Sequence, residues 1–232
     1  MYSKLEFELE FITPAFIGGA FNQEKEYLEL RPASLIGSLR YWFRNLLGTI
    51  TDDVDAIYKL EEELFGSQQK AGAVKVRVKP KEVKINDNLD HLGEEEKEAL
   101  SYIGFGNIIK RENKRTKEVF YSVRPYLDIG SKYKITFLVP KKYEDLFVYF
   151  LYLYNFLGSL GGRSRRGWGN FILKPVSGLK EEFRSLNWEV FDIDSIKWIY
   201  KSLKAYSGIK LVNDKVLWSF KVFEPKEDFF KG

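Results

Sequence analysis

The sequence contains no cysteine and a single histidine, His91, among its 232 residues. The absence of cysteine excludes disulfide frameworks, thiolate nucleophiles, and zinc or iron–sulfur centres with cysteine ligands. One histidine likewise excludes metal sites built from several imidazoles. The most apolar window, residues 146–157, is well short of the roughly 20 residues that a membrane-spanning helix needs. We therefore predict no metal, no cofactor, no small-molecule substrate and no membrane span.

The composition is typical of a packed globular protein. Hydrophobic residues make up 44% of the chain and aromatic residues 16%, which excludes intrinsic disorder. A length of 232 residues fits one large domain or two small ones. Lysine and arginine together number 37 against 33 acids, so the net charge of +4 permits a nucleic-acid partner without requiring one. The N-terminal residues form no apolar leader, and we expect a cytoplasmic protein.

The hydrophobic pattern predicts an α+β fold. Strands are expected at residues 4–12, 74–79, 133–139 and 168–176, and the first of them alternates strictly between apolar and acidic residues. Long helices are expected at residues 33–47, where Pro32 suits a first helical turn, and at residues 143–157. The resulting βαββαβ order is that of a ferredoxin-like domain, an antiparallel sheet covered on one face by two helices.

Two regions lie outside this core pattern. Around residues 80–130 we predict an insertion with a helix at 94–102 and a strand at 118–123, and a shorter helix at 53–64 precedes it. Beyond residue 176 we predict a C-terminal extension, residues 177–232, with a helix at 194–206 and a strand at 215–223. The predicted division is therefore a ferredoxin-like domain over residues 1–176 with the extension packed on it.

A segment rich in glycine and arginine follows the second long helix. Its glycines can let the backbone approach a partner and direct N–H groups at an anion, and its arginines are forked donors that match phosphate. It lies between a helix and a strand, whereas a P-loop or dinucleotide fingerprint lies between a strand and a helix. A solvated basic turn, with glycines needed for tight packing, is an equally simple interpretation. The candidate RNA-binding residues here are Gly161, Gly162, Arg163, Ser164, Arg165, Arg166 and Gly167.

A second candidate segment joins the end of the first strand to the first long helix. Ser34 and Gly37 are predicted to lie in the first helical turn, where free N–H groups and the helix dipole favour a phosphate. Arg40 and Arg44 share one helix face, although simple pairing with surface acids would also explain them. The candidate RNA-binding residues in this segment are Gly18, Gly19, Arg31, Ser34, Gly37, Arg40 and Arg44.

The two segments together resemble the RAMP superfamily of CRISPR proteins, whose members share ferredoxin-like domains. The Pro-x-Ser-x-x-Gly-x-x-Arg pattern that introduces the first helix stands at residues 32–40, and the Gly-rich loop at residues 161–169. Residues 12–20 and 30–44 are most similar to the first-subunit family of the Cmr complex, the type III-B CRISPR effector. Trp168 stands where that family often has phenylalanine, and the chain is shorter than a member with two ferredoxin-like domains.

The resemblance implies a non-catalytic RNA-binding subunit of an effector ribonucleoprotein that serves antiviral defence. Its implied partners are other Cmr subunits, the guide RNA (crRNA) towards its 3′ end, and target RNA. The alternative is a metal-independent endoribonuclease that processes CRISPR repeats, because some RAMP relatives do so with a histidine in or near the first helix. Here that helix has no histidine, and His91 lies in a predicted turn. A ferredoxin-like interaction module without an RNA role is a third interpretation.

Several other residues have simpler structural interpretations. The acidic runs at 61–63 and 94–96 are predicted to be solvated helix faces. Asp52 or Asp53 is predicted to cap one helix, and Asp192 and Asp194 are also interpreted as caps. The tryptophans of predicted elements are interpreted as core residues: Trp42, Trp168, Trp198 and Trp218. Aromatic residues in predicted loops are the better candidates for base stacking: Phe21, Tyr27 and Phe105.

Overall fold

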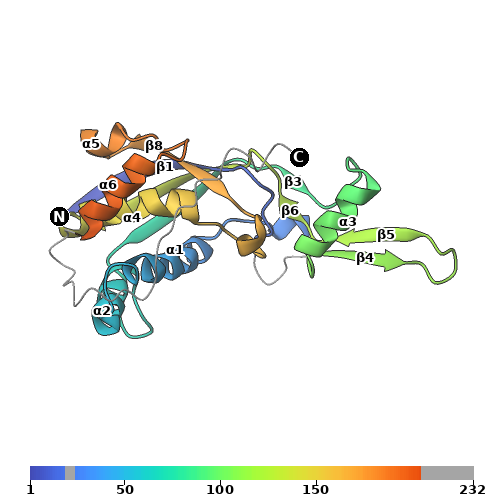
Figure 1. Ribbon diagram of the computed structural model, residues 1–232, viewed down its shortest axis with the longest axis horizontal. Coiled ribbons are helices and arrows are strands. Elements are labelled where there is room, and N and C mark those ends of the chain that lie inside the picture. Colours follow the sequence, from blue (N-terminus) through green and yellow to red (C-terminus); the bar gives the residue numbers. More distant parts are fainter. Residues whose placement is uncertain (19–23, 205–232) are drawn as a thin grey trace, which may run out of the picture.

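A computed structural model describes residues 1–18 and 24–204 of the chain (Figure 1). Its main sheet has four strands in the order β2-β7-β1-β8, and every neighbouring pair is antiparallel. These strands are β1 (Tyr2–Phe11), β2 (Lys75–Glu82), β7 (Lys132–Pro140) and β8 (Phe171–Ser177). The predicted α+β class with an antiparallel sheet is confirmed, and each of the four strands predicted for the core overlaps an observed one.

Three helices pack with this sheet. They are α1 (Pro32–Leu47), α2 (Val54–Phe65) and α4 (Glu144–Leu157), which match the predicted helices to within one residue at nearly every end. Pro32 occupies the first turn of α1, where its missing N–H costs nothing. Asp53 caps α2 as predicted, because the backbone N–H of Ala56 donates to its Oδ1 at 2.9 Å.

The core lies between the helices and one face of the sheet. Alternation along β1 buries its apolar residues completely, as the pattern predicted, and the opposite residues face outward. Phenylalanine rings fill much of the space between layers, with Phe137 and Phe147 centred 5.2 Å apart and Phe43 and Phe150 also 5.2 Å apart. Buried aromatic area of this kind is the main source of stability, since apolar burial contributes about 25 cal/mol per Å².

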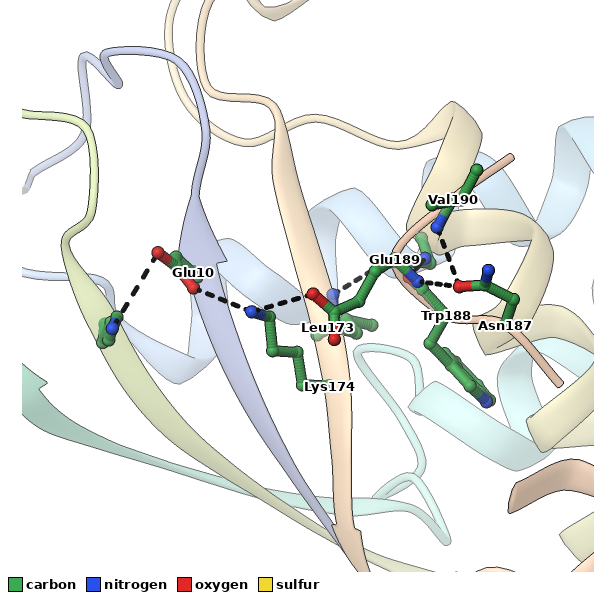
Figure 2. Close-up of polar contacts among 9 residues, drawn as sticks. Glu10, Leu173, Lys174, Asn187, Trp188, Glu189 and Val190 are labelled. Atoms are coloured by element: carbon green, nitrogen blue, oxygen red, sulfur yellow. Dashed lines mark hydrogen bonds and ion pairs between the residues drawn. The ribbon is translucent and has the colours of Figure 1, made fainter. Parts of the chain in front are cut away.

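The outer face of the sheet is a network of ion pairs. The ammonium groups of Lys4 and Lys134 each lie 2.9 Å from Glu6 Oε1, and these hydrogen bonds lower the pKa of Glu6 to about 2. Lys174 lies between Glu10 at 3.3 Å and Glu189 at 3.1 Å (Figure 2). Acids and bases therefore pair across β1, β7 and β8 on this face, while Arg77 and Lys79 on the edge strand β2 are exposed beside these pairs.

The insertion forms its own small unit beside the Gly-rich loop. Its elements are β3 (Ile85–Asn86), α3 (Glu94–Ile103), β4 (Ile108–Glu112), β5 (Val119–Val123) and β6 (Tyr126–Leu127). The β4–β5 hairpin projects away from the main body (Figure 1). A separate cluster of buried side chains joins the insertion to the rest of the chain, and it consists of Phe16, Leu89, Ile108, Tyr126 and Trp168.

The extension packs against the β8 side of the core. After the short helix α5 (Glu181–Arg184), Trp188 packs on Phe7 at 5.3 Å and on Tyr152 at 5.1 Å. Helix α6 (Ile193–Lys204) follows, and Asp192 caps it as predicted through the N–H of Ser195. The predicted strand at 215–223, with Trp218, lies outside the described residues. Among residues 1–18 and 24–204, no helix has the length and apolar run needed to cross a bilayer.

Candidate nucleic-acid interface

The two segments singled out from the sequence meet in space. They form opposite walls of a cleft of about 370 Å³ that opens to solvent. The α1 wall contributes hydroxyl groups and two aromatic rings, and the Gly-rich loop contributes hydroxyl groups, backbone and one guanidinium. The lining residues are Ser34, Ser38, Tyr41, Trp42, Ser159, Gly161, Ser164 and Arg165.

A chain of hydrogen bonds holds the Gly-rich loop against α1. The buried Tyr154 hydroxyl donates to Ser38 Oγ at 2.9 Å, and Ser38 Oγ donates to the Ser159 carbonyl at 3.1 Å. Ser159 Oγ in turn donates to the carbonyl of Ser164 at 3.0 Å. Complete burial raises the pKa of the Tyr154 hydroxyl, so it stays a neutral donor. Ser38, Tyr154 and Ser159 therefore position the loop, and the sequence does not reveal this role, because isolated serines and one tyrosine in an apolar helix form no motif.

The Gly-rich loop is tied to the insertion by two of its arginines. Arg163 has a left-handed backbone (φ 60°), and its Nε donates to the Phe105 carbonyl at 2.7 Å. Arg166 Nη1 donates to the Tyr102 carbonyl at 3.4 Å. Residues Ser164–Arg166 form a short 3-10 helix, η3, between these contacts. The segment is therefore a braced loop and more than a solvated basic turn.

The glycines of the loop mainly allow its backbone to pack closely against other backbone segments of the same protein. A Cβ at Gly161 (φ 97°) would lie 2.5 Å from the Phe16 carbonyl oxygen, and one at Gly169 would lie 1.8 Å from that of Leu160. The N–H of Gly162 donates to the Phe16 carbonyl at 2.8 Å. The prediction that the loop directs its N–H groups at an anion is thus wrong for Gly162, because the donor is already used within the protein. Gly167 has open space around it.

Arg40 and Arg44 converge on one buried carboxylate. Arg40 Nε lies 2.7 Å and Arg44 Nη1 lies 3.2 Å from Glu61 Oε1, and the Glu61 side chain is only 1% exposed. The prediction of a solvated acidic face is therefore wrong at Glu61, because α2 packs this position against α1. The Arg40 side chain is 32% exposed and the Arg44 side chain 52%. Part of each guanidinium-bearing side chain therefore stays accessible to solvent, while Glu61 fixes its orientation.

The start of α1 differs from its predicted role as a phosphate site. The Ser34 N–H donates to the Arg31 carbonyl at 3.0 Å, and Gly37 lies in the second turn because α1 begins at Pro32. The expectation of free first-turn donors at Ser34 and Gly37 is therefore wrong. Gly37 is exposed, with nothing within 4 Å of the position of a Cβ, and it lies beside the cleft. Arg31 Nη2 contacts the Gly18 carbonyl at 3.5 Å, and Gly19 lies outside the described residues.

The division of the aromatic residues between the core and the surface differs in part from the prediction. Trp42 is partly buried and lines the cleft instead of lying wholly in the core, and Tyr41 beside it is 40% exposed. The Arg165 guanidinium lies 5.9 Å from the centre of the Tyr41 ring, within cation–π range. Trp168 is buried as predicted, whereas Trp198 packs on Tyr149 and Phe183 at the edge of α6 and stays 42% exposed. Of the loop aromatics, Phe105 is exposed and Phe21 lies outside the described residues.

His91 is exposed and lies apart from this cleft, at the rim of a second cavity. Within the part of the chain that the structure describes, no three His, Asp or Glu side chains gather as a metal-ligand set. Among the described residues that line the cleft, the side chains are hydroxyl, aromatic and arginine groups, and none is a carboxylate or imidazole that could serve as a general base. Its chemistry suits binding: arginine for phosphate, hydroxyls for polar edges, and flat rings for bases.

Comparisons with known proteins identify the family of the chain. A family model described as the RAMP superfamily matches residues 8–172. The Cmr subunit Cmr1-2 of Pyrococcus furiosus is 33% identical over 186 residues, which are 76% of this chain and 97% of that protein. The Cmr subunit Cmr1-1 of the same organism is 29% identical over 206 residues, which are 88% of this chain and 57% of that protein.

Solved structures give the same relationship. The crystal structure of Cmr1 from Pyrococcus furiosus superimposes with a TM-score of 0.62 at 28% identity, over 92% of this chain and 63% of that one. A chain of the type III-B Cmr-beta complex bound to cognate target RNA matches with a TM-score of 0.54 at 14% identity, over 92% of this chain and 64% of that one, and shows a shared fold alone. The chain thus spans less than two thirds of these longer relatives. By its matched residues and its curated relatives, the chain belongs to the RAMP superfamily and, within it, to the family of Cmr1 subunits of the type III-B Cmr complex.

Proposed function

We propose that this chain is an RNA-binding subunit of a type III-B CRISPR effector ribonucleoprotein that acts in antiviral defence in the cytoplasm. In this role it contacts the guide RNA towards its 3′ end, or the target RNA, and assembles with other Cmr subunits. The observation that carries the proposal is the single cleft into which α1 and the Gly-rich loop bring Tyr41, Trp42 and Arg165. Relatives described as Cmr subunits, and a matching chain from a complex bound to target RNA, support it.

The proposal includes a ferredoxin-like fold for residues 1–176, with the insertion at about residues 80–130 and the extension at 177–232. The strand order β2-β7-β1-β8 supports it, because α1 and α2 connect β1 to β2, and α4 connects β7 to β8. In such a fold the loops at one end of the sheet meet, which brings the α1 segment and the Gly-rich loop together.

Each wall of the cleft has a distinct part in the proposed contact. The exposed arginines Arg163, Arg165 and Arg166 attract the phosphate backbone, which positions the strand without reading its sequence. Tyr41 and Trp42 offer rings on which an unpaired base can stack. Glu61 orients Arg40 and Arg44 on the neighbouring face of α1. Gly37 leaves this side of the helix open for a close approach of the strand.

The alternative function is a metal-independent RAMP endoribonuclease that processes CRISPR repeat RNA. It needs a general base near the scissile 2′-hydroxyl, and α1 contains no histidine. His91 is the candidate that the sequence offers, and it lies in the turn before α3 at the other cavity. A module without an RNA role is the third candidate, and it predicts no RNA affinity at all.

We predict that the isolated protein does not cleave RNA. Incubation with labelled CRISPR repeat RNA in EDTA is expected to leave the RNA intact, because no general base lines the cleft. The check is a denaturing gel over several hours, with His91→Ala as the matched variant. Cleavage at one position that persists in EDTA and disappears in His91→Ala would establish the endoribonuclease instead.

Gly37→Asp is expected to weaken RNA binding about tenfold. A carboxylate there stands beside the cleft, and a like charge near a phosphate costs about 1 kcal/mol or more at contact distances. The free energy of unfolding should change by less than about 0.5 kcal/mol, because aspartate and glycine have similar helix propensities and the site is open. Fluorescence anisotropy with a labelled single-stranded RNA measures the binding.

Two variants control this experiment. Gly37→Ala adds bulk without charge, and Tyr58→Asp adds the same charge at an exposed position of α2. We expect Tyr58→Asp to bind RNA like the parent. If Gly37→Asp also binds like the parent, α1 does not contact the RNA and this side of the proposed interface must be abandoned.

A further inference from the structure

Two exposed aromatic side chains of the insertion lie beside the Gly-rich loop. Phe105 stands between Gly104 and Gly106 in the turn that connects α3 to β4, and it is 66% exposed. Tyr102, in the last turn of α3, is 79% exposed. Both rings therefore present most of their surface to solvent, where a ligand can reach them.

The backbone that carries Phe105 is fixed by hydrogen bonds and packing. The Gly104 N–H donates to the Leu100 carbonyl at 2.8 Å, and the Gly104 carbonyl accepts from the Ile108 N–H at 3.0 Å. A Cβ at Gly104 would lie 3.2 Å from the Trp168 ring, so the turn rests directly on the buried cluster beneath it. Gly106 completes the turn with a left-handed backbone (φ 92°). The turn thus holds an apolar ring outward on a preorganised support.

Two arginines of the Gly-rich loop hold the same segment. Arg163 Nε donates to the Phe105 carbonyl at 2.7 Å, and Arg166 Nη1 donates to the Tyr102 carbonyl at 3.4 Å. A Cβ at Gly106 would lie 3.2 Å from Arg163 Nη2, which places that guanidinium against the turn. A guanidinium has five N–H donors, and each of these hydrogen bonds uses one of them. The other donors of the two exposed arginines are available to a phosphate.

This arrangement puts flat apolar faces next to forked positive groups. A nucleotide has the same pairing of features, because its base and its phosphate are separated by one sugar. Proteins that bind single-stranded nucleic acid combine basic groups along the backbone with aromatic rings on which the bases stack. An apolar protein segment would match the rings but not the adjoining guanidinium groups. The chemistry of this surface therefore favours RNA over a protein partner.

We propose that Phe105 and Tyr102 each stack on an unpaired base of the RNA strand whose phosphates lie on Arg163 and Arg166. This inference rests on the proposed RNA-binding function and extends its interface from the cleft beside α1 to the insertion. Arg165 lies over Tyr41 on the cleft side of the loop, so the arginines stand between two sets of stacking rings. The strand crosses the loop from one set to the other.

Removal of either ring tests the inference in the full chain. The probes are a mixed-sequence single-stranded RNA of about ten nucleotides and its abasic counterpart with the same phosphates. We expect Phe105→Ala and Tyr102→Ala each to bind the RNA about tenfold more weakly, and the abasic strand as the parent does. Phe105→Trp should bind the RNA at least as tightly as the parent, because a larger ring is kept at the same place.

One control variant and two further measurements exclude simpler explanations. Tyr58→Ala removes a ring that is 56% exposed on α2, and it should bind both probes like the parent. Urea denaturation should give the parental stability for all of these variants, because each ring is exposed. The slope of log affinity against log salt should also be unchanged, since both arginines are present. A ring that merely supported the arginine loop would lower that slope and weaken the binding of the abasic strand.

The outcomes separate the two levels of the proposal. A parent protein that binds neither probe overturns the RNA-binding function itself. A parent that binds RNA, together with Phe105→Ala and Tyr102→Ala variants that bind it equally well, overturns the stacking contact alone and assigns these rings to a protein partner. Equal weakening for the RNA and its abasic counterpart also overturns the stacking contact, because the loss then does not concern a base.

Discussion

Replacing Arg163, Arg165 and Arg166 together by alanine is expected to lower the slope of log affinity for single-stranded RNA against log salt by up to about 2. Each neutralised phosphate of a single strand contributes about 0.7 to that slope, and at about 0.1 M salt the change is up to roughly a hundredfold loss of affinity. All three side chains are exposed around one hollow of the loop. The loss should be similar for two unrelated sequences of equal length, because phosphate contacts carry no base information.

The control for this experiment removes three positive charges elsewhere. Three exposed lysines serve here: Lys59 on α2, Lys70 in the segment before β2, and Lys75 at the start of β2. Their replacement by alanine changes the net charge equally. We expect the parental slope for that variant. An unchanged slope for the arginine variant, or a loss confined to one RNA sequence, would rule out the phosphate role.

Arg163 and Arg166 also donate hydrogen bonds to the Phe105 and Tyr102 carbonyls, which the triple variant removes. They brace the loop against the insertion, but both lie at the exposed surface, where such a bond contributes about 1 kcal/mol. The triple variant should therefore fold. The single variant Arg165→Ala leaves both of these hydrogen bonds in place and should lower the slope by about 0.7. It therefore measures the loss of a phosphate contact without any loosening of the loop.

The elements of the core could be predicted because each carries a period that burial enforces. β1 alternates without exception, and α1 repeats apolar residues at helical spacing between Pro32 and Gly48. Both bury one continuous face, so pattern and structure coincide. The predicted helix at 94–102 corresponds to α3 for a different reason: none of its residues is buried, but Gly93 and the three glutamates after it form a strong helix start.

The insertion and extension were harder because their elements are short or exposed on both faces. In β4 only Ile108 is buried and the other four residues are exposed. Neither face of this strand is buried along its length, so burial imposes no alternation of apolar and polar residues on its sequence. β3 and β6 are two residues each, and α5 is four residues, all below the length at which a period can be recognised. Tertiary contacts decide these elements, and a single sequence does not contain them.

For the candidate site, the sequence identified the segments but not the partners of individual side chains. Glu61 stands in a run of three glutamates, and only the packing of α2 on α1 distinguishes it as the buried acceptor of two arginines. Arg163, Arg165 and Arg166 look alike in the sequence, yet two of them contact carbonyls of the insertion and the third lies over Tyr41. Such differences come from contacts between residues tens of positions apart.

Asn155→Leu is expected to lower the free energy of unfolding by about 2–5 kcal/mol. Asn155 is buried in α4, where its Oδ1 accepts from the Leu173 N–H at 2.6 Å and its Nδ2 donates to the Trp188 carbonyl at 2.7 Å. The same two backbone segments are seen side by side in Figure 2. Leucine has a similar volume but no polar atom, so one N–H and one carbonyl lose their partners in the interior, at about 1–3 kcal/mol each. Urea denaturation measures the change.

Asn45→Leu is the matched control, because Asn45 also bonds a backbone carbonyl, that of Tyr41, but at the exposed surface of α1. Its effect should stay within about 1 kcal/mol. Among residues 1–18 and 24–204, no strand covers the side of β8 on which the Leu173 N–H lies, so Asn155 accepts there the hydrogen bond that a neighbouring strand would accept, and it joins the extension to the sheet. Limited proteolysis of Asn155→Leu should therefore cut within residues 178–204 first. Equal stability of the two variants would show that this edge is held by the packing of Trp188 on Phe7 and Tyr152 alone.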